Sequence, residues 1–232
     1  MTFYQQLQQA TSDARNQLLS APIIQRCLTN EISLEEYVAF LQQAYHHVKH
    51  TSPLLMATGA RLPESKEWLR AAVAEYIEEE QGHQEWVLND IAACGFDKEK
   101  ARRNRPNFST EVMVAYAYDM VNRISPLGFF GMVNVLEGTS INIATLAAGR
   151  IKDSLGLPNK AFSYLTSHGE LDKQHIQFFE GLMNQITDVE EQQLIIHAAN
   201  NFYRLYGNVF RELDGAQATS IALDAPTMQA VG

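Results

Sequence analysis

The histidines and the carboxylate of segment 168–175 have the spacing of a metal-ligand motif. His168, Asp172 and His175 lie at positions i, i+4 and i+7. On an α-helix, this spacing places the three side chains on one face over two turns. Imidazole nitrogens and a carboxylate oxygen on one face suit a borderline transition metal such as iron, manganese or zinc. The alternative is a solvated helical face that carries a His–Asp pair.

Glu80 and His83 form a second candidate ligand pair, in the sequence Glu-Glu-Gln-Gly-His of residues 79–83. The apolar periodicity of 64–94 predicts a helix whose buried face includes Glu80 and His83, with Glu79 beside it. Carboxylate-bridged dimetal bundles use this Glu-x-x-His spacing. A buried carboxylate must be neutralised or bind a cation. The alternative is an exposed acidic run at 78–80 and a hydrogen-bonded core histidine at position 83.

A third candidate, Glu137, is the one carboxylate in the apolar stretch 129–143. A single charge inside such a helix is costly unless it is paired, so its alternative role is a structural salt bridge. Together the three segments offer three imidazoles and three carboxylates, close to the ligand set of a diiron–carboxylate centre. These six candidate metal ligands are Glu80, His83, Glu137, His168, Asp172 and His175.

Three more histidines, His46, His47 and His50, lie close together on another expected helix. His47 shares its face with apolar neighbours and is the best inward candidate for a further ligand, while His46 and His50 lie nearer the polar side. The alternative is a polar patch without ligands. Which of these histidines joins the site stays open, and so does the role of Glu79.

Two tyrosines are candidate catalytic residues. Tyr76 lies two turns before His83 on the same face, from which it could approach a metal. Tyr116 lies on an expected helix near the ligand motifs, and Asn134 is a further candidate pocket residue. The alternative role of the tyrosines is core packing with a hydrogen-bonded hydroxyl group.

The elements that must position these residues are helices, because apolar residues recur with a period of 3.6 along nearly the whole chain. We expect helices over 2–19, 21–28, 34–60, 64–94, 109–124, 127–155, 158–184 and 188–213. Ser33 with Glu36 predicts a capping box, and Pro53 predicts a kink. No segment alternates long enough to predict a strand. The expected fold is all-α, a single compact bundle of about seven or eight helices.

Composition and charge narrow the function. The chain has 232 residues, a formal net charge of −9 and two cysteines, Cys27 and Cys94. The negative charge argues against nucleic acid and anionic membrane as partners, and the absence of a CxxC pair argues against a zinc ribbon. Neither a signal peptide nor an apolar run of ~20 residues is present, so we expect a cytoplasmic protein. We expect one domain over 1–213 and a tail over 214–232.

The motifs together resemble those of the heme-oxygenase-like superfamily, which includes TenA thiaminase-type proteins, the pyrroloquinoline quinone synthase PqqC and heme-oxygenase-like diiron oxidases. The resemblance covers about residues 1–213 and is carried by segments 45–50, 79–83, 136–140 and 168–175. It implies a heme-oxygenase-like bundle. Matched residue by residue, the ligands of the diiron branch correspond to His83, Glu137, His168, Asp172 and His175, with Glu80 at a position that varies among members.

Two departures from the diiron branch leave the number of metal ions open. Where the family supplies a carboxylate from an earlier helix, this chain has His46 and His47, and where some members have a glutamate two turns before the histidine, it has Tyr76. The resemblance therefore implies two iron ions, with one iron ion or manganese as the alternative. Segment 109–136 lacks the cysteine of TenA-like thiamine hydrolases, and His46 is the first histidine, which argues against heme.

The expected function is an O2-dependent metal oxidase or oxygenase, with O2 and a small organic amine, acid or metabolite as substrates. We expect the substrate to lie in an apolar cavity lined by Phe129, Phe130 and Tyr203. One alternative is a non-catalytic or cofactorless small-molecule-binding protein of the TenA/PqqC type, and another is a structural or partner-binding bundle. By analogy with the superfamily, we expect a homodimer.

Overall fold

The computed structural model describes residues 1–214, apart from the side chains of Asn142 and of residues 168–174, and within this part no strand occurs. The predicted all-α class is confirmed. The first half of the chain contains α1 (Phe3–Ala10), α2 (Ser12–Leu19), α3 (Pro22–Leu28), α4 (Leu34–Val48), α5 (Thr51–Arg61), α6 (Glu67–Glu80) and α7 (His83–Ala93). The second half contains α8 (Lys98–Arg103), α9 (Phe108–Asp119), α10 (Phe129–Leu155), α11 (Ser163–Met183) and α12 (Val189–Glu212).

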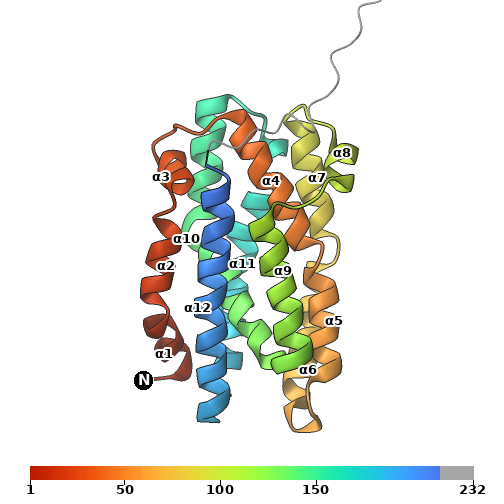
Figure 1. Cartoon of the computed structure of the whole chain (residues 1–232), viewed down its shortest axis with the longest axis vertical. Helices are drawn as coiled ribbons and strands as arrows, with labels where there is room; N and C mark the ends of the chain where they lie inside the picture. The colour runs from red at the N-terminus through yellow and green to blue at the C-terminus, as the bar shows by residue number, and fades with distance from the viewer. Residues whose placement is uncertain (215–232) are drawn as a thin grey trace, which may run out of the picture.

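Helix α10 packs against α11, α12, α3 and α5, and Figure 1 shows it passing behind α12. The close approach of α10 to α12 depends on Gly131. A Cβ atom at position 131 would lie 2.7 Å from the backbone nitrogen of Ala199 and 2.8 Å from Cβ of Ala198. Only glycine therefore lets the two helices touch at this level.

A buried carboxylate from α7 positions α11. Asp90 is fully buried, and its Oδ1 accepts a hydrogen bond from the backbone nitrogen of Ser163 at 3.0 Å and another from the Ser163 hydroxyl. Its Oδ2 accepts a hydrogen bond from the backbone nitrogen of Tyr164 at 2.8 Å. Burial raises the pKa of the Asp90 carboxyl, and the hydrogen bonds from Ser163 and Tyr164 oppose this shift. The carboxylate thus caps the positive end of α11 from a different helix.

Three of the helices predicted as continuous, 2–19, 34–60 and 64–94, are broken, and these predictions were wrong. The segment 34–60 divides into α4 and α5 at Lys49 and His50, and Pro53 lies in the first turn of α5 instead of kinking a longer helix. Proline lacks an N–H and clashes with the carbonyl four residues earlier, so it is tolerated in a first turn. The segment 64–94 divides into α6 and α7 at Gly82, whose φ is 94°.

Other helix bounds agree with the prediction or add to it. The capping box of Ser33 and Glu36 starts α4 as expected. The predicted first helix is interrupted at Thr11, which separates α1 from α2. The short helix α8, capped by Asp97, was not predicted because its six residues are mostly charged. No helix in the described part of the chain is long and apolar enough to cross a membrane.

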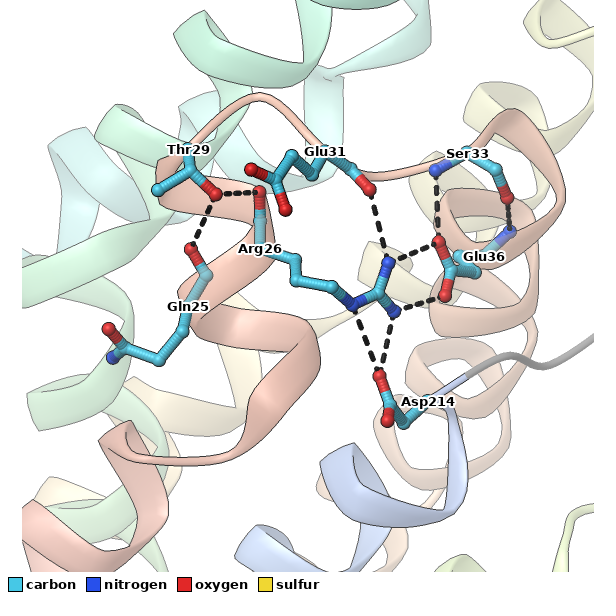
Figure 2. A network of polar contacts seen from close by, with 7 residues as sticks. All are labelled: Gln25, Arg26, Thr29, Glu31, Ser33, Glu36 and Asp214. Carbon is cyan, nitrogen blue, oxygen red and sulfur yellow. Dashed lines mark hydrogen bonds and ion pairs between the residues drawn. The ribbon is translucent and has the colours of Figure 1, made fainter.

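Helix α3 is held in place by its single arginine (Figure 2). The guanidinium group of Arg26 donates hydrogen bonds to both carboxylate oxygens of Glu36 on α4 and to the backbone oxygen of Glu31. It also donates to Oδ1 of Asp214, from Nη2 at 2.7 Å and from Nε at 3.2 Å. Residues 215–232 of the predicted tail lie outside the described residues.

We predict that Asp90→Ala lowers the free energy of unfolding by about 2–4 kcal/mol, because it leaves buried N–H groups of Ser163 and Tyr164 without an acceptor. Urea denaturation followed by circular dichroism measures this loss. Asp97→Ala is the matched control, because Asp97 caps a short helix at the surface. A loss from Asp90→Ala no larger than that of the control would contradict the capping role.

We also predict opposite effects for the same substitution at two glycines of α10. Gly131→Ala should lower the free energy of unfolding by about 1–3 kcal/mol, because the added methyl overlaps α12. Gly149→Ala should raise it by about 0.5–1 kcal/mol, because nothing lies within 4 Å of a Cβ there and alanine favours the helix. Thermal or urea melts of both variants test the pair, and a stabilised Gly131→Ala protein would refute the close-contact argument.

Candidate metal centre

The candidate ligands Glu80 and His83 come together at a turn between two helices. Glu80 ends α6, Gly82 takes a left-handed conformation, and His83 begins α7. Nδ1 of His83 lies 3.1 Å from Oε2 of Glu80, and both side chains are nearly buried, at 3% and 11% exposed. The expectation that one continuous helix holds them was wrong. The helix is interrupted at the left-handed Gly82 instead, and the side chains of Glu80 and His83 still meet across this turn.

His175 meets two carboxylates from different helices. Its Nε2 lies 2.9 Å from Oε2 of Glu79 on α6, and its Nδ1 lies 3.9 Å from Oε1 of Glu137 on α10. The side chain of Glu137 is 12% exposed, whereas that of Glu79 is 42% exposed. The apolar periodicity placed Glu79 beside the buried face, and the contact with His175 arises only because α11 packs next to the end of α6.

Tyr76 and His47 also face the same interior space. Tyr76 is buried, and its ring centroid lies 6.0 Å from that of His175. His47 is buried, with its ring centroid 5.6 Å from that of Tyr206 on α12. Both residues line one cavity together with Glu80 and Glu137.

The other two histidines of this segment, His46 on α4 and His50 just before α5, lie elsewhere. His46 was expected near the polar side but is only 1% exposed, because α4 packs against α7 and α9. Burial, with Lys49 Nζ only 3.2 Å from its Nδ1, lowers the pKa of His46 to about 4. Nδ1 of His50 lies 3.0 Å from the hydroxyl oxygen of Tyr118, and burial lowers the pKa of the His50 imidazole. Neither residue lines the cavity.

Several predicted pocket residues are not brought to this group. The Tyr116 hydroxyl accepts a hydrogen bond from Nδ2 of Asn201 at 2.9 Å, away from the cavity. Asn134 is buried and accepts a hydrogen bond from Gln8 at 2.8 Å. Of the aromatic residues expected to line the cavity, Phe129 does so, whereas Phe130 and Tyr203 pack elsewhere in the core.

The predicted ligands His168 and Asp172 belong to α11, but their side chains lie outside the described residues. Among the side chains that are described, no three of His, Cys, Asp or Glu lie close enough together to hold a metal ion. The described donors make three pairwise contacts instead, between Glu80 and His83, between Glu79 and His175, and, at 3.9 Å, between Glu137 and His175. Imidazole and carboxylate donors are the types that suit iron, so the chemistry of this donor set fits the metal.

One cavity of about 150 Å³ opens beside these donors. Its polar residues include His47, Tyr76, Glu80 and Glu137, and most of its remaining lining is apolar. Such a cavity, with a few polar groups at one place and apolar walls elsewhere, is typical of a small-molecule site. The arrangement can therefore hold an organic molecule in contact with the carboxylates and histidines.

Solved structures with the same fold come from proteins of differing function. A domain of unknown function with a heme oxygenase-like fold from Shewanella denitrificans OS217 is 20% identical, with 93% of each chain covered and a TM-score of 0.82. A TenA homologue from Pseudomonas syringae is 14% identical over 92% of this chain and 93% of its own, with a TM-score of 0.78. The predicted heme-oxygenase-like fold is confirmed.

A heme oxygenase from Leptospira interrogans is 15% identical over 91% of this chain and 100% of its own, with a TM-score of 0.73. These identities show the fold alone. None of the curated proteins matches the sequence. A family model described as iron-containing redox enzyme matches residues 38–207, which run from α4 to α12 and include every candidate metal ligand. The chain therefore belongs to this family of iron-containing redox enzymes.

Proposed function

We propose that this chain is a non-heme iron oxidase or oxygenase that binds two iron ions and acts on a small organic substrate with O2. One observation carries the proposal: Glu80 and Glu137 line the same cavity, and each lies next to a buried histidine. Buried carboxylates beside imidazoles are costly unless they are paired or bind a cation. Membership in a family of iron-containing redox enzymes supports iron as that cation.

In the proposed site, Glu80, His83, Glu137 and His175 would hold the metal ions, and His168 and Asp172 of α11 would complete the set. Bound iron supplies the redox chemistry with O2, which no protein side chain can provide. The histidines must bind in their neutral form and the carboxylates in their ionised form, so binding releases protons.

The remaining cavity residues orient the substrate and exclude water. The Tyr76 side chain is 2% exposed and borders the cavity beside His175, where it can hydrogen-bond a polar group of the substrate. His47 borders it from α4. Apolar walls such as Phe129, Met132 and Leu136 keep water from the reacting group.

A second candidate function is small-molecule binding without iron. The TenA homologues among the solved structures and the largely apolar cavity favour it. In this case the same polar residues hold a ligand by hydrogen bonds. The two functions differ in whether the chain retains iron and consumes O2.

We predict that the chain, loaded anaerobically with ferrous iron and desalted, retains about two iron ions and loses most of them in the His175→Ala variant. Loss of a ligand should lower iron affinity at least as much as loss of an outer-shell partner, which costs on the order of 10–100-fold. Metal quantitation per chain, followed by exposure to O2 under an optical monitor, measures both retention and reaction.

His197→Ala is the matched control for this experiment, because His197 is exposed on α12 and lies 3.0 Å from Asn201, away from the cavity. This variant should load like the unaltered chain. Absence of retained iron in the unaltered chain would favour the small-molecule-binding function, and equal loading of all three proteins would exclude His175 as a ligand.

Removal of the metal should also lower thermal stability. A ligand at about 100 times its dissociation constant adds about 2.7 kcal/mol to the folded state. For a chain of this size, we therefore expect chelation of the iron-loaded protein to lower Tm by about 5–10 °C. Differential scanning calorimetry with and without chelator measures the shift. An unchanged Tm in a chain shown to carry iron would contradict a metal centre in the core.

A further inference from the structure

We infer that the substrate carries an extended apolar chain, and that Ala144 and Ala147 of α10 set the length of chain that the cavity accepts. This inference rests on the proposed function, because it places the reacting end of the substrate at Glu80 and Glu137. It adds the chemical class of the substrate, an amphiphile with one polar end, and it assigns the two residues that select it.

The cavity is elongated along α10. Along α10, the lining residues begin at Phe129, pass Glu137 and continue through Ser140, Ala144 and Ala147 to Ile151. At a rise of 1.5 Å per residue, Ile151 lies about 21 Å along the helix axis from Glu137. The cavity thus has a long arm that leaves the polar centre and follows α10 toward its C-terminal end. A long arm fits a chain better than a compact ring.

The walls of this arm are largely apolar and aromatic. Helix α3 contributes Ile23, Ile24, Cys27 and Leu28 to the lining. The lining also includes three aromatic side chains that pack on one another, with centroid separations of 6.5 Å between Phe40 and Tyr164 and 5.9 Å between Phe40 and Phe210. No lysine or arginine is among the lining residues that the structure describes. The arm therefore favours a hydrocarbon and offers no partner for a second charged group.

Two small residues keep the arm open. Ala144 and Ala147 lie three residues apart on the same face of α10, between the larger lining residues Ile143 and Ile151. Any larger side chain at 144 or 147 would project into the space that a substrate chain must pass. The size of the side chains at positions 144 and 147 therefore determines how long a substrate chain can be.

The opposite wall is tied to neighbouring elements by ion pairs. Arg26 ties α3 to Glu36 at the start of α4 and to Asp214 after α12 (Figure 2). The Glu36 side chain is 6% exposed, so this pair is partly shielded from solvent. Because Arg26 joins α3 both to α4 and to the residues after α12, we expect a bulky residue on α10 to shorten the arm instead of displacing α3.

The test measures the dissociation constants of hexanol, octanol, decanol and dodecanol for the metal-free full-length chain by isothermal titration calorimetry. Affinity should rise about fourfold with each methylene that the arm buries. In Ala147→Phe, hexanol should bind nearly as tightly as it does to the unaltered protein. Decanol and dodecanol should lose the extra affinity that their additional methylenes give in the unaltered protein. Ala147→Leu should give an intermediate cutoff, which keeps the test decisive if the phenylalanine variant folds poorly.

Thr145→Phe is the matched control, because residue 145 is exposed on the same helix and does not line the cavity. It should show the same dependence on chain length as the unaltered protein. A flat dependence in the unaltered protein, or equal weakening of all four alcohols by Ala147→Phe and Ala147→Leu, would overturn the inference. Since the alcohols are titrated without metal, the result is independent of whether the chain binds iron.

Discussion

The buried hydrogen bonds between Asp90 and the first turn of α11 are the constraint on which the candidate site depends. Helix α11 contributes His175 to the described contacts, and its position relative to α6 and α10 decides which carboxylates His175 can reach. A carboxylate without solvent must find donors, and here they are the N–H groups of the first turn of α11, which have no acceptor within their own helix. These hydrogen bonds pair the N–H groups at the start of α11 and offset part of the free-energy cost of burying the Asp90 carboxylate. They also fix the position of α11 relative to α7.

Helix α10 serves both packing and the candidate site, because one of its faces packs against α12 and another lines the cavity. One face lies so close to α12 that Gly131 leaves no room for a side chain. Another face contributes Glu137 to the polar centre and then small residues to the arm of the cavity. A long, rigid helix can hold a charged group beside an apolar channel because its backbone polar groups are satisfied internally. The apolar surroundings of Glu137 are therefore both core and cavity wall.

The polar centre lies where a helix is interrupted. Glu79 and Glu80 end α6, and His83 begins α7, with a left-handed Gly82 between them. Glu79 and Glu80 are successive residues of α6, so their side chains point about 100° apart, with Glu79 toward His175 and Glu80 toward His83. With Glu137 on α10 and His175 on α11, the polar centre draws on four helices. Imidazole and carboxylate donors are the types that suit iron, which agrees with the family of iron-containing redox enzymes to which the chain belongs.

The sequence by itself determined the all-α class, the bounds of the later helices and the inward direction of Glu80, His83 and Glu137, because apolar periodicity is a local property that survives in the chain order. It did not determine the break at Gly82 or the restart at Thr51, since a glycine or a proline within a periodic stretch is compatible with either a kink or an end. It also missed the burial of His46 and the contact of Glu79 with His175. Only the tertiary structure decided these, because both depend on which helix packs beside the residue, and no local pattern records that neighbour.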